Sequence, residues 1–293
     1  MLAEAVIDEE MYFTEEEVQH MLDHIDEYSD HEVSEIYKVV SELERRKILH
    51  AVRNDLISFC QHMDNEYIVG NHHKILADML MAIERGIKDR ICVNIPPRHG
   101  KSMLDSTYYP AWYLGRNPTK KVMLVSHTTD LAVDFGRKVR NIINTDAYRE
   151  IFPHVSLASD SKSAGRWNTN HGGEFYACGV GSALAGRGAH LLLIDDPHSE
   201  QDVLNGNFEV FAKAYEWFTF GARTRLMPGG AVAIIQTRWH LDDLTGRVVR
   251  DMQRDPGVDQ YEVIEFPAIL ELEDKNTGEI VEKPLWPEFF DLE

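Results

Sequence analysis

The fold of this chain is decided by one short stretch, Ile95-Pro96-Pro97-Arg98-His99-Gly100-Lys101-Ser102. An apolar segment typical of a strand, residues 90–95, leads into it, and a segment with the pattern of a helix follows. In such a loop the backbone N–H groups around Gly100, together with the start of the helix, form a site for an anion. The stretch therefore predicts a phosphate-binding loop and a nucleoside triphosphate as its ligand.

Two side chains at the end of this loop have the chemistry that the interpretation requires. Lys101 would place its charge between the β- and γ-phosphates, and the Ser102 hydroxyl would bind Mg²⁺. The stretch departs from the usual pattern G-x-x-x-x-G-K-[ST], because Ile95 stands where the first glycine is expected and a rigid Pro96-Pro97 pair follows it. A bare Gly-Lys-Ser occurs by chance in many chains, so the interpretation depends on the flanking strand and helix.

A second apolar run supplies carboxylates for the same site. Residues 191–194 are all leucine or isoleucine, which is typical of a buried parallel strand, and Asp195-Asp196-Pro197 follows them. Ligands of open α/β sheets bind beyond the carboxyl ends of the strands, so Asp195 can meet the Mg²⁺ that Ser102 holds. The alternative is that the two aspartates only end a core strand. The loop upstream favours the metal site.

The composition is that of a globular protein. The chain has 293 residues, of which 43% are hydrophobic, and no apolar stretch approaches the ~20 residues that a membrane span needs. Its first ten residues lack the basic start of a signal peptide, so we expect a cytoplasmic protein with no membrane partner. Cys60, Cys92 and Cys178 have no C-x-x-C spacing, which argues against a disulfide framework or a zinc site.

The net charge of −19 is concentrated at the two ends of the sequence. Residues 1–40 carry a net charge of −12 and residues 259–293 carry −9, which leaves +2 for the residues between them. A near-neutral middle permits a local basic groove for nucleic acid in spite of the acidic total. Two basic clusters are candidates for such a groove, with solvated helix faces as the alternative: Arg137, Lys138 and Arg140, or Arg223 and Arg225.

Hydrophobic periodicity predicts an α/β protein. Apolar residues at helical spacing indicate a helical lead-in over residues 15–60 and a helix over 74–85. Strands and helices then alternate, which is typical of a mostly parallel sheet with helices on both faces. The expected strands are residues 90–95, 121–126, 174–178, 191–194, 231–236 and 261–266, and the expected helices between them are residues 101–115, 130–144, 208–222 and 243–252.

Four sequence motifs stand in order along the chain: Pro96 to Ser102; Gly186-Arg187-Gly188-Ala189 leading into Ile194-Asp195-Asp196-Pro197; Thr237-Arg238-Trp239-His240 with Asp242-Asp243-Leu244; and Leu285-Trp286-Pro287-Glu288. The set resembles the large terminase subunit of tailed bacteriophages from about residue 59 onward. The resemblance implies an ATPase domain of the additional-strand, RecA-like P-loop class, which in that family precedes an RNase H-like nuclease. It divides the chain into an acidic helical segment (1–58), a P-loop ATPase domain (59–283) and a linker (284–293). The nuclease domain is expected to be missing, so no nuclease activity is expected.

The resemblance also assigns roles to residues around the loop. Pro97, Arg98, His99, Gly100, Lys101 and Ser102 would bind ATP, while Ser102 and Asp195 would hold Mg²⁺. A carboxylate next to the metal aspartate would position the attacking water. Family members usually carry glutamate at that place. Here it is Asp196, one methylene shorter, and Glu200 competes with Asp196 for the catalytic role.

Three further residues receive catalytic roles from the resemblance, each with a plainer alternative. Arg98 can reach the γ-phosphate, or it can brace the loop by pairing with a carboxylate. Arg187, flanked by glycines, is expected to act as an arginine finger on the nucleotide of a neighbouring subunit, or to be a solvent-exposed turn residue. Thr237 is expected to sense the γ-phosphate and couple hydrolysis to movement, or to cap its strand locally.

Two expectations concern residues beside these motifs. The family places contacts to the base of ATP upstream of the loop, which here indicates residues 59–73, with His72 and His73 as candidates. Asp242 is expected to cap the helix that follows it.

The leading hypothesis is an ATP hydrolase that translocates double-stranded DNA into a procapsid, with Mg²⁺ as cofactor. By analogy with the family it would work in the infected bacterial cell as a homo-oligomeric ring, with portal protein and small terminase subunit as partners. An isolated motor domain of this kind can be monomeric. Two alternatives stay open. One is a helicase-like, nucleic-acid-stimulated ATPase, for which the length leaves no room for a second motor domain. The other is a nucleotide-binding assembly module that hydrolyses little.

Overall fold

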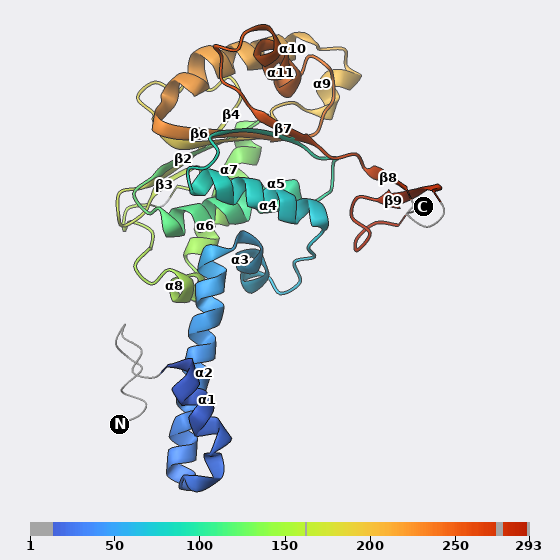
Figure 1. The fold of residues 1–293 in the computed structure, drawn as a ribbon. Coiled ribbons are helices and arrows are strands. Elements are labelled where there is room, and N and C mark those ends of the chain that lie inside the picture. Colours follow the sequence, from blue (N-terminus) through green and yellow to red (C-terminus); the bar gives the residue numbers. More distant parts are fainter. Residues whose placement is uncertain (1–13, 162, 274–277, 292–293) are drawn as a thin grey trace. The chain divides into compact units, whose positions relative to one another are not determined.

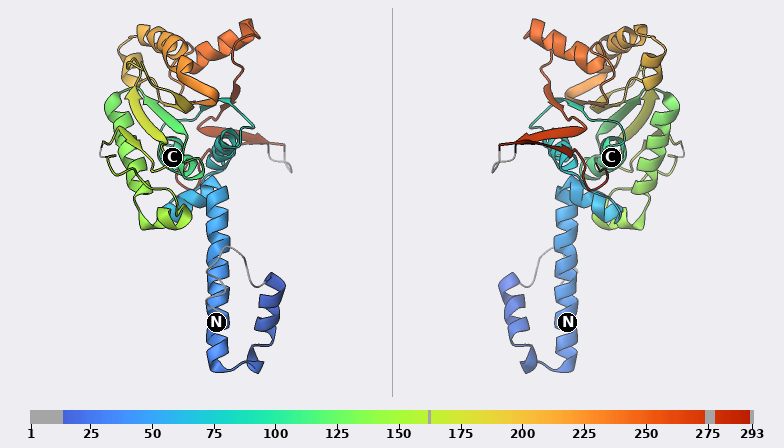
Figure 2. Two further views of the ribbon diagram at one scale, coloured as in Figure 1. Left: turned by 90° about the vertical axis from the view of Figure 1, so that its left-hand side faces the viewer. Right: turned by 90° about the vertical axis from the view of Figure 1, so that its right-hand side faces the viewer.

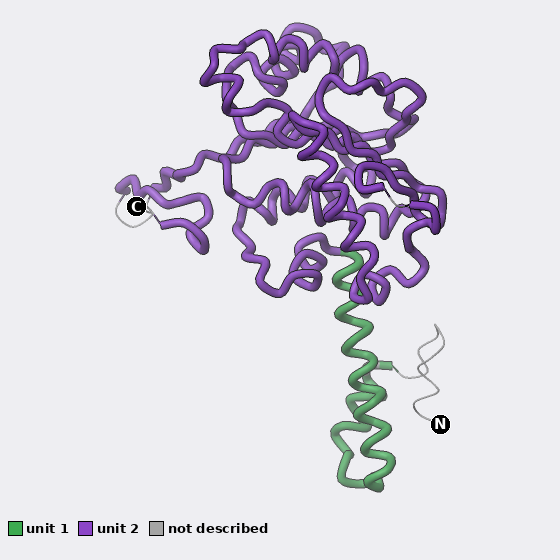
Figure 3. The backbone as a smooth tube through the Cα atoms, turned by 180° about the vertical axis from the view of Figure 1, so that it is seen from behind, with its two compact units in different colours: residues 1–54 green, residues 55–293 purple. Residues whose placement is uncertain are grey.

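The computed structural model describes residues 14–161, 163–273 and 278–291. The predictions for residues 1–13 and 292–293, at the two ends of the chain, lie outside the described residues. The chain divides into two compact units, Met1–Asn54 and Asp55–Glu293 (Figure 3). The boundary between the units precedes Asp55, whereas the sequence placed one after residue 58.

The first unit is helical. It contains α1 (Glu15–Asp23), the short 3₁₀-helix η2 (Ile25–Glu27) and the long helix α2 (Asp30–Asn54). Thr14 caps α1: its hydroxyl accepts a hydrogen bond from the Glu17 N–H at 3.2 Å, and the Glu17 carboxylate accepts one from the Thr14 N–H at 2.6 Å. Val18 of α1 packs against Val39 of α2, so the helical lead-in is a hairpin.

The second unit is built on a seven-stranded sheet with the order β3-β4-β2-β5-β6-β1-β7. All neighbouring strands are parallel except β3 and β4, which run antiparallel. The predicted mostly parallel α/β sheet is therefore confirmed. The strands are β1 (Arg90–Asn94), β2 (Lys121–Ser126), β3 (Arg166–Asn168), β4 (Glu174–Gly179), β5 (Ala189–Asp195), β6 (Leu226–Gln236) and β7 (Glu262–Glu265).

Helices cover both faces of this sheet (Figures 1 and 2). One layer contains α4 to α7, and the other contains α9 to α11. The helices of the second unit are α3 (Leu56–Met63), α4 (Asn71–Glu84), α5 (Lys101–Met103), the π-helix η3 (Leu104–Tyr108), α6 (Tyr109–Arg116), α7 (Thr129–Ile143), α8 (Asp146–Ile151), α9 (Glu200–Leu204), α10 (Glu209–Glu216), the π-helix η4 (Trp217–Ala222), the 3₁₀-helix η5 (Arg223–Arg225) and α11 (Leu244–Arg254).

The central strands are apolar on both faces because both faces are covered. Residues 191–194 of β5 are at most 1% exposed, and so are residues 232–235 of β6. Alternate residues of each strand face opposite helical layers, so an unbroken apolar run is needed where two layers meet one sheet. This is why the strands were readable as continuous hydrophobic segments.

Several elements were not predicted. The edge strand β3 and the antiparallel pair β8 (Ile269–Glu273) and β9 (Ile280–Pro284) are short. The helix expected over residues 208–222 is α-helical only over α10 and continues as the π-helix η4. Among the described residues, none of the helices combines the length and apolar composition that crossing a bilayer requires.

Candidate functional site

The predicted phosphate-binding loop joins β1 to one helical run, in which α5, η3 and α6 follow each other without a break. Two loop residues have left-handed backbones, Arg98 with φ 62° and Gly100 with φ 75°. Such residues turn neighbouring N–H groups toward one side, which is the geometry of an anion-binding concavity. Arg98 is exposed, and its guanidinium forms no ion pair with any residue that the structure describes. Its charge is therefore available to a ligand on the loop.

Two buried histidines of α4 hold this loop. His72 and His73 each direct Nε2 at the carbonyl oxygen of His99, at 2.9 Å. The Nδ1 atom of His73 accepts a hydrogen bond from the Gly70 N–H at 3.0 Å, so its Nε2 carries the hydrogen. Burial lowers the pKa of His73 to about 4, which keeps the ring neutral. Both rings thus support the loop, and neither offers an exposed surface to the base of ATP.

Gly100 is required at its position for two reasons. Its φ of 75° favours glycine, and a Cβ atom there would lie 2.4 Å from His73 Nε2. Trp286 covers the same histidines, with its ring centroid 4.8 Å from that of His73, and it is 7% exposed. The motif at residues 285–288, which the resemblance placed in a linker, therefore packs against the loop in this structure.

The Lys101 side chain reaches the ends of two neighbouring strands. Its Nζ lies 2.8 Å from Asp196 Oδ2, just beyond β5, and donates a hydrogen bond to Thr237 Oγ1 at 3.0 Å, just beyond β6. The Thr237 N–H in turn donates to Asp196 Oδ1 at 2.7 Å, and its hydroxyl donates to the Ile95 carbonyl oxygen at 3.2 Å. Asp196 has a left-handed backbone with φ 42°. The structure thus joins three of the predicted site residues, Lys101, Asp196 and Thr237, in one hydrogen-bonded cluster with the start of the loop.

Asp195 ends β5 and is 1% exposed. Its Oδ2 accepts a hydrogen bond from the Ser106 hydroxyl at 2.9 Å, while its Oδ1 has no partner within the described part of the chain. Burial, followed by the charge of Asp196, raises the pKa of Asp195, and Lys101 and the Ser102 hydroxyl oppose that rise. A buried carboxylate oxygen with no partner, beside a hydroxyl, fits a hard cation such as Mg²⁺.

Sequence reasoning missed Asp105, which lies in the π-helical turn η3 and is 1% exposed. Neither of its carboxylate oxygens has a hydrogen-bond partner of good geometry among the residues described. Burial, and then the charge of Asp195, raises the pKa of Asp105 well above its ordinary value. Nothing in the sequence signals this, because an aspartate inside a helix is usually exposed.

Proline explains where the π-helical turn occurs. Pro110 has no N–H group to donate to the carbonyl oxygen of Ser106, four residues earlier, so the regular hydrogen-bond ladder is broken at this point. Helices commonly accommodate such a break with a wider turn, and π-turns are frequent at functional sites. Ser102, Asp105 and Ser106 of this helical run all interact with Asp195.

Other polar side chains at this edge of the sheet also lack partners. The side-chain atoms of Asn94 and Gln236, at the ends of the paired strands β1 and β6, have no hydrogen bonds to the described residues. The same holds for the hydroxyl of Ser126, which ends β2. Buried polar groups are normally hydrogen-bonded, so a concentration of unpartnered groups is typical of a site that binds water, ions or ligand.

The two candidate catalytic carboxylates differ in their surroundings. Asp196 is bound by Lys101 and Thr237, as described above. Glu200 is exposed in the first turn of α9. His198, which lies between these two residues in the sequence, is 4% exposed. Its Nε2 accepts a hydrogen bond at 3.0 Å from the Leu244 N–H, at the start of α11. Burial lowers the pKa of His198 to about 4, so it is a neutral acceptor; the sequence analysis missed it.

Arg187 lies away from this cluster, at the opposite edge of the sheet. It precedes β5, whose other end carries Asp195, so the two residues are separated by on the order of 25 Å along the strand. Its guanidinium lies 3.3 Å from Glu174 Oε1 and 4.6 Å from the centre of the Tyr176 ring. Arg187 therefore cannot act on a nucleotide held by its own loop, and action on a neighbour's nucleotide stays a prediction.

The predicted helix cap after the third motif was wrong by one residue. Asp243, not Asp242, caps α11: its Oδ1 accepts a hydrogen bond from the Gly246 N–H at 2.9 Å. Asp243 is fully buried and also pairs with Arg238 at 2.7 Å, whereas Asp242 pairs with Arg250. Two adjacent aspartates offer the same chemistry, and only the turn that precedes the helix decides which of them points at the free N–H groups.

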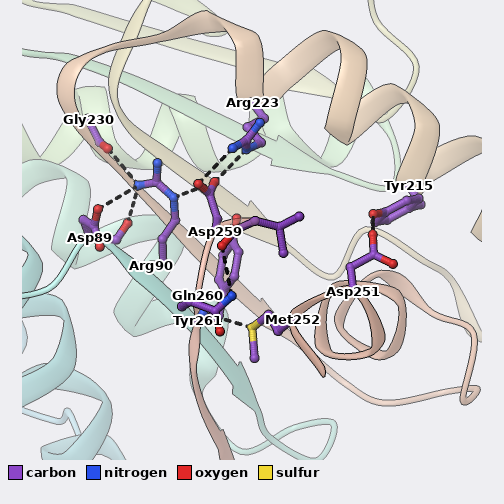
Figure 4. A network of polar contacts seen from close by, with 11 residues as sticks. Asp89, Arg90, Tyr215, Arg223, Gly230, Asp251, Met252, Asp259, Gln260 and Tyr261 are labelled. Atoms are coloured by element: carbon purple, nitrogen blue, oxygen red, sulfur yellow. Dashed lines mark hydrogen bonds and ion pairs between the residues drawn. The ribbon is translucent and has the colours of Figure 1, made fainter. Parts of the chain in front are cut away.

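The amino edge of the sheet, where the parallel strands begin, contains a network of paired charges (Figure 4). The carboxyl edge is the opposite one, where these strands end. Arg90, at the start of β1, donates from Nε to Asp259 Oδ2 at 2.9 Å and from Nη1 to the Gly230 carbonyl oxygen at 3.0 Å. Arg223 binds the same carboxylate at 2.6 and 2.9 Å. The hydrogen bond from Arg223, together with Arg90, lowers the pKa of Asp259 to about 2. Arg223 is thus occupied within the fold and is no free part of a basic groove.

The other predicted basic cluster is also partly occupied. Arg137 pairs with Asp134 at 2.7 Å, and the Lys138 ammonium lies 5.3 Å from the centre of the Phe135 ring.

The described residues contain no group of three histidine, cysteine, aspartate or glutamate side chains that converge on one metal position. The loop, Lys101 and Asp195 nevertheless form a cluster suited to an anion together with a cation. The chain matches no family model and no curated protein.

Proposed function

We propose that this chain is the ATP-hydrolysing motor domain of a viral DNA-packaging terminase. The observation that carries the proposal is the position of β6. It lies between β1, which leads into the loop, and β5, which carries Asp195. A strand inserted between these two defines the additional-strand class of P-loop ATPases that the resemblance implies.

Different residues of the site would bind different parts of a triphosphate. The N–H groups around Gly100 and the ammonium of Lys101 would bind the phosphates, and Arg98 would extend from the loop toward the γ-phosphate. Lys101 already contacts the ends of β5 and β6, so a phosphate would compete with Asp196 for its charge. Thr237 contacts both Lys101 and Asp196 and would therefore respond to that change.

Ser102 and Asp195 would hold Mg²⁺, which when bound supplies charge neutralisation for the phosphates. One protein carboxylate and one hydroxyl suffice for Mg²⁺, because this ion keeps several waters and takes its other ligands from the nucleotide. Asp196 is the nearer of the two candidate bases to this site, and Glu200 is the alternative. For Asp196 to accept a proton from water, it must first be released from Lys101.

Translocation of double-stranded DNA, the ring of subunits and the portal and small-subunit partners are proposals that rest on the motif resemblance. Arg187 can serve only a neighbouring subunit, because it lies at the amino edge of the sheet. It would first have to leave Glu174 and Tyr176.

Steady-state ATP hydrolysis measured against protein concentration, with and without double-stranded DNA, tests the proposal. We expect turnover to rise with concentration and with DNA, and to be abolished by both Lys101→Ala and Arg187→Ala. Lys121→Ala, a change on the same amino edge as Arg187, is the control and should leave turnover unchanged. Turnover that is unaffected by Lys101→Ala would contradict the proposal.

One observation favours a second candidate, the nucleotide-binding assembly module with little turnover. Asp196 is held by both Lys101 and the Thr237 N–H, so in this arrangement the expected base is neutralised. Tight ATP binding that Lys101→Ala abolishes, with no turnover at any concentration or with DNA, would select this candidate. A helicase-like ATPase would instead be stimulated by single strands.

A further inference from the structure

We propose that Asp105 is a further carboxylate of the magnesium site, and that it binds the cation through a water molecule on the metal. The inference rests on the proposed function only in taking the cation at Asp195 to be Mg²⁺. It concerns a residue outside the four motifs, in the helical turn that follows the loop.

The position of Asp105 is the first argument. It lies close enough to Asp195 to be affected by that charge, and Ser102 and Ser106 of the same helical run also lie close to Asp195. Ser106 gives its hydroxyl hydrogen to Asp195, which leaves both oxygens of Asp105 without a hydrogen bond of good geometry among the described residues. A carboxylate that is 1% exposed needs a partner, because burying such a group unpaired is destabilising.

The charge balance is the second argument. Three carboxylates, Asp105, Asp195 and Asp196, surround the single ammonium of Lys101 and interact with it electrostatically. Fully ionised, this group carries two excess negative charges, which a divalent cation neutralises. Asp195 Oδ1 and both Asp105 oxygens are the unpartnered atoms, so the missing positive charge belongs between these two side chains.

The geometry favours contact through water rather than direct ligation. No three acidic, histidine or cysteine side chains converge on one ion within the residues that the structure covers. Mg²⁺ loses its waters reluctantly and commonly keeps several. Carboxylates that orient such waters hold the cation as well as its direct ligands do, and removing one typically costs about 10- to 100-fold in metal affinity.

Mn²⁺ binding to the full chain without nucleotide, followed by electron paramagnetic resonance, tests the inference. Asp105→Asn keeps the shape of the side chain and removes its charge, and we expect it to weaken Mn²⁺ binding by about 10- to 100-fold. Thr107→Ser, a buried change in the same π-turn, is the matched control and should stay within about twofold of the native chain. Native-like Mn²⁺ affinity in Asp105→Asn, or no Mn²⁺ binding by the native chain, would overturn the proposal.

Thermal unfolding with and without Mg²⁺ separates metal binding from a structural role. Without metal, Asp105→Asn should unfold at the same temperature as the native chain or higher, because asparagine has the same shape and carries no charge that burial would penalise. With Mg²⁺ the native chain should gain stability and the variant should gain less. Equal gains would overturn the proposal. If the asparagine variant does not fold, Asp105→Ser is measured in its place.

A third variant distinguishes failure of this inference from failure of the proposed function. Lys101→Ala should abolish ATP binding but retain Mn²⁺ binding in the absence of nucleotide, because it removes only the competing positive charge. Mn²⁺ binding that depends on Asp105 in a chain that does not bind ATP would support the metal role and refute the ATPase proposal. ATP binding that depends on Lys101, with Mn²⁺ binding insensitive to Asp105, would do the reverse.

Discussion

The charged side chains at the two edges of the seven-stranded sheet differ in how they are paired. At the amino edge three arginines are paired with carboxylates: Arg90 and Arg223 share Asp259, and Arg187 contacts Glu174. At the carboxyl edge Lys101 is the cation that acts on three buried or half-buried carboxylates, and Asp105 and Asp195 have oxygens without partners in the described residues. The same sheet thus has ion pairs centred on Asp259 and Glu174 at one edge and an unbalanced group of carboxylates around Lys101 at the other.

The difference separates structural from functional electrostatics. The paired edge lowers the pKa of Asp259, whereas burial beside like charges raises the pKa of Asp105 and Asp195. The first arrangement stabilises the fold without any ligand. The second places like charges together in a buried site, and strongly perturbed groups of this kind concentrate at functional sites.

The largest expected effect comes from a comparison of two lysines, one beyond each end of β1, that are replaced by alanine in separate variants. Lys101→Ala should reduce ATP hydrolysis at least about 100-fold, because it removes a preorganised charge from the phosphates. Lys88→Ala, which breaks the pair with Glu262 at the amino edge, should leave hydrolysis unchanged. Steady-state turnover of the two variants checks the comparison, and equal losses would show that the edges do not differ in function.

As the pH falls, the free energy of unfolding should first decrease through two buried histidines at the carboxyl edge. His73 and His198 have pKa values of about 4 in the folded chain against an ordinary value of 6.5, so the unfolded chain binds protons more readily. Their stabilisation is complete above pH 6.5 and is lost as the pH falls toward 4, by about 2 kcal/mol per histidine at pH 5. Asp259, with a pKa of about 2, contributes above its ordinary pKa of 3.8 and loses that contribution only below it.

Urea unfolding between pH 7 and pH 4 measures this dependence. His198→Gln should flatten it, and His31→Gln, on the exposed surface of α2, should not change it. A free energy of unfolding that is constant down to pH 4 would contradict the assignment of neutral buried histidines.

Breaking the paired edge should affect stability without affecting binding. Asp259→Asn removes the carboxylate that Arg90 and Arg223 share, which leaves Arg90 only its longer pair with Asp89 at 3.5 Å. It should lower the free energy of unfolding by about 2 kcal/mol, while ATP affinity stays unchanged. The exposed pair of Asp146 and Arg149 provides a control, since Asp146→Asn should change stability by less than about 0.5 kcal/mol. Denaturant unfolding and ATP titration of both variants check this; a weakened ATP affinity in Asp259→Asn would mean that the two edges are coupled.

The smallest effect compares two glycines with left-handed backbones. Gly100→Ala and Gly181→Ala both incur the cost of a positive φ, about 1 kcal/mol. A Cβ atom at Gly100 would also clash with the His73 ring, whereas a Cβ atom at Gly181 would have no neighbour within 4 Å. Gly100→Ala should therefore be the less stable of the two by about 1 kcal/mol and should alone lose ATP affinity. Equal stability would mean that the loop moves away from His73 at no cost.

The sequence predicted the strands that border this candidate site. The apolar runs of residues 90–95 and 191–194 marked β1 and β5, because strands buried on both faces are hydrophobic without interruption. The loop and Asp195 therefore followed from short segments. The pairing of Lys101 with Asp196 and Thr237 fits the same pattern, since all three lie at strand ends on one edge.

Features that depend on distant parts of the chain were not predictable. The burial of Asp105 results from packing of η3 against β5, and the role of His73 results from the position of the His99 carbonyl oxygen. The location of Arg187 follows from the direction of β5, which places it at the opposite edge from Asp195. Trp286 was assigned to a linker because nothing in its neighbourhood shows that it packs over the loop.

ATP binding measured by calorimetry in the presence of Mg²⁺ tests the central claim most directly, that the carboxyl edge is a nucleotide site and the amino edge is structural. The native chain and Asp259→Asn should bind ATP with the same affinity, and Lys101→Ala should show no binding. Equal affinity of Lys101→Ala and the native chain, or no binding by the native chain, would contradict the account.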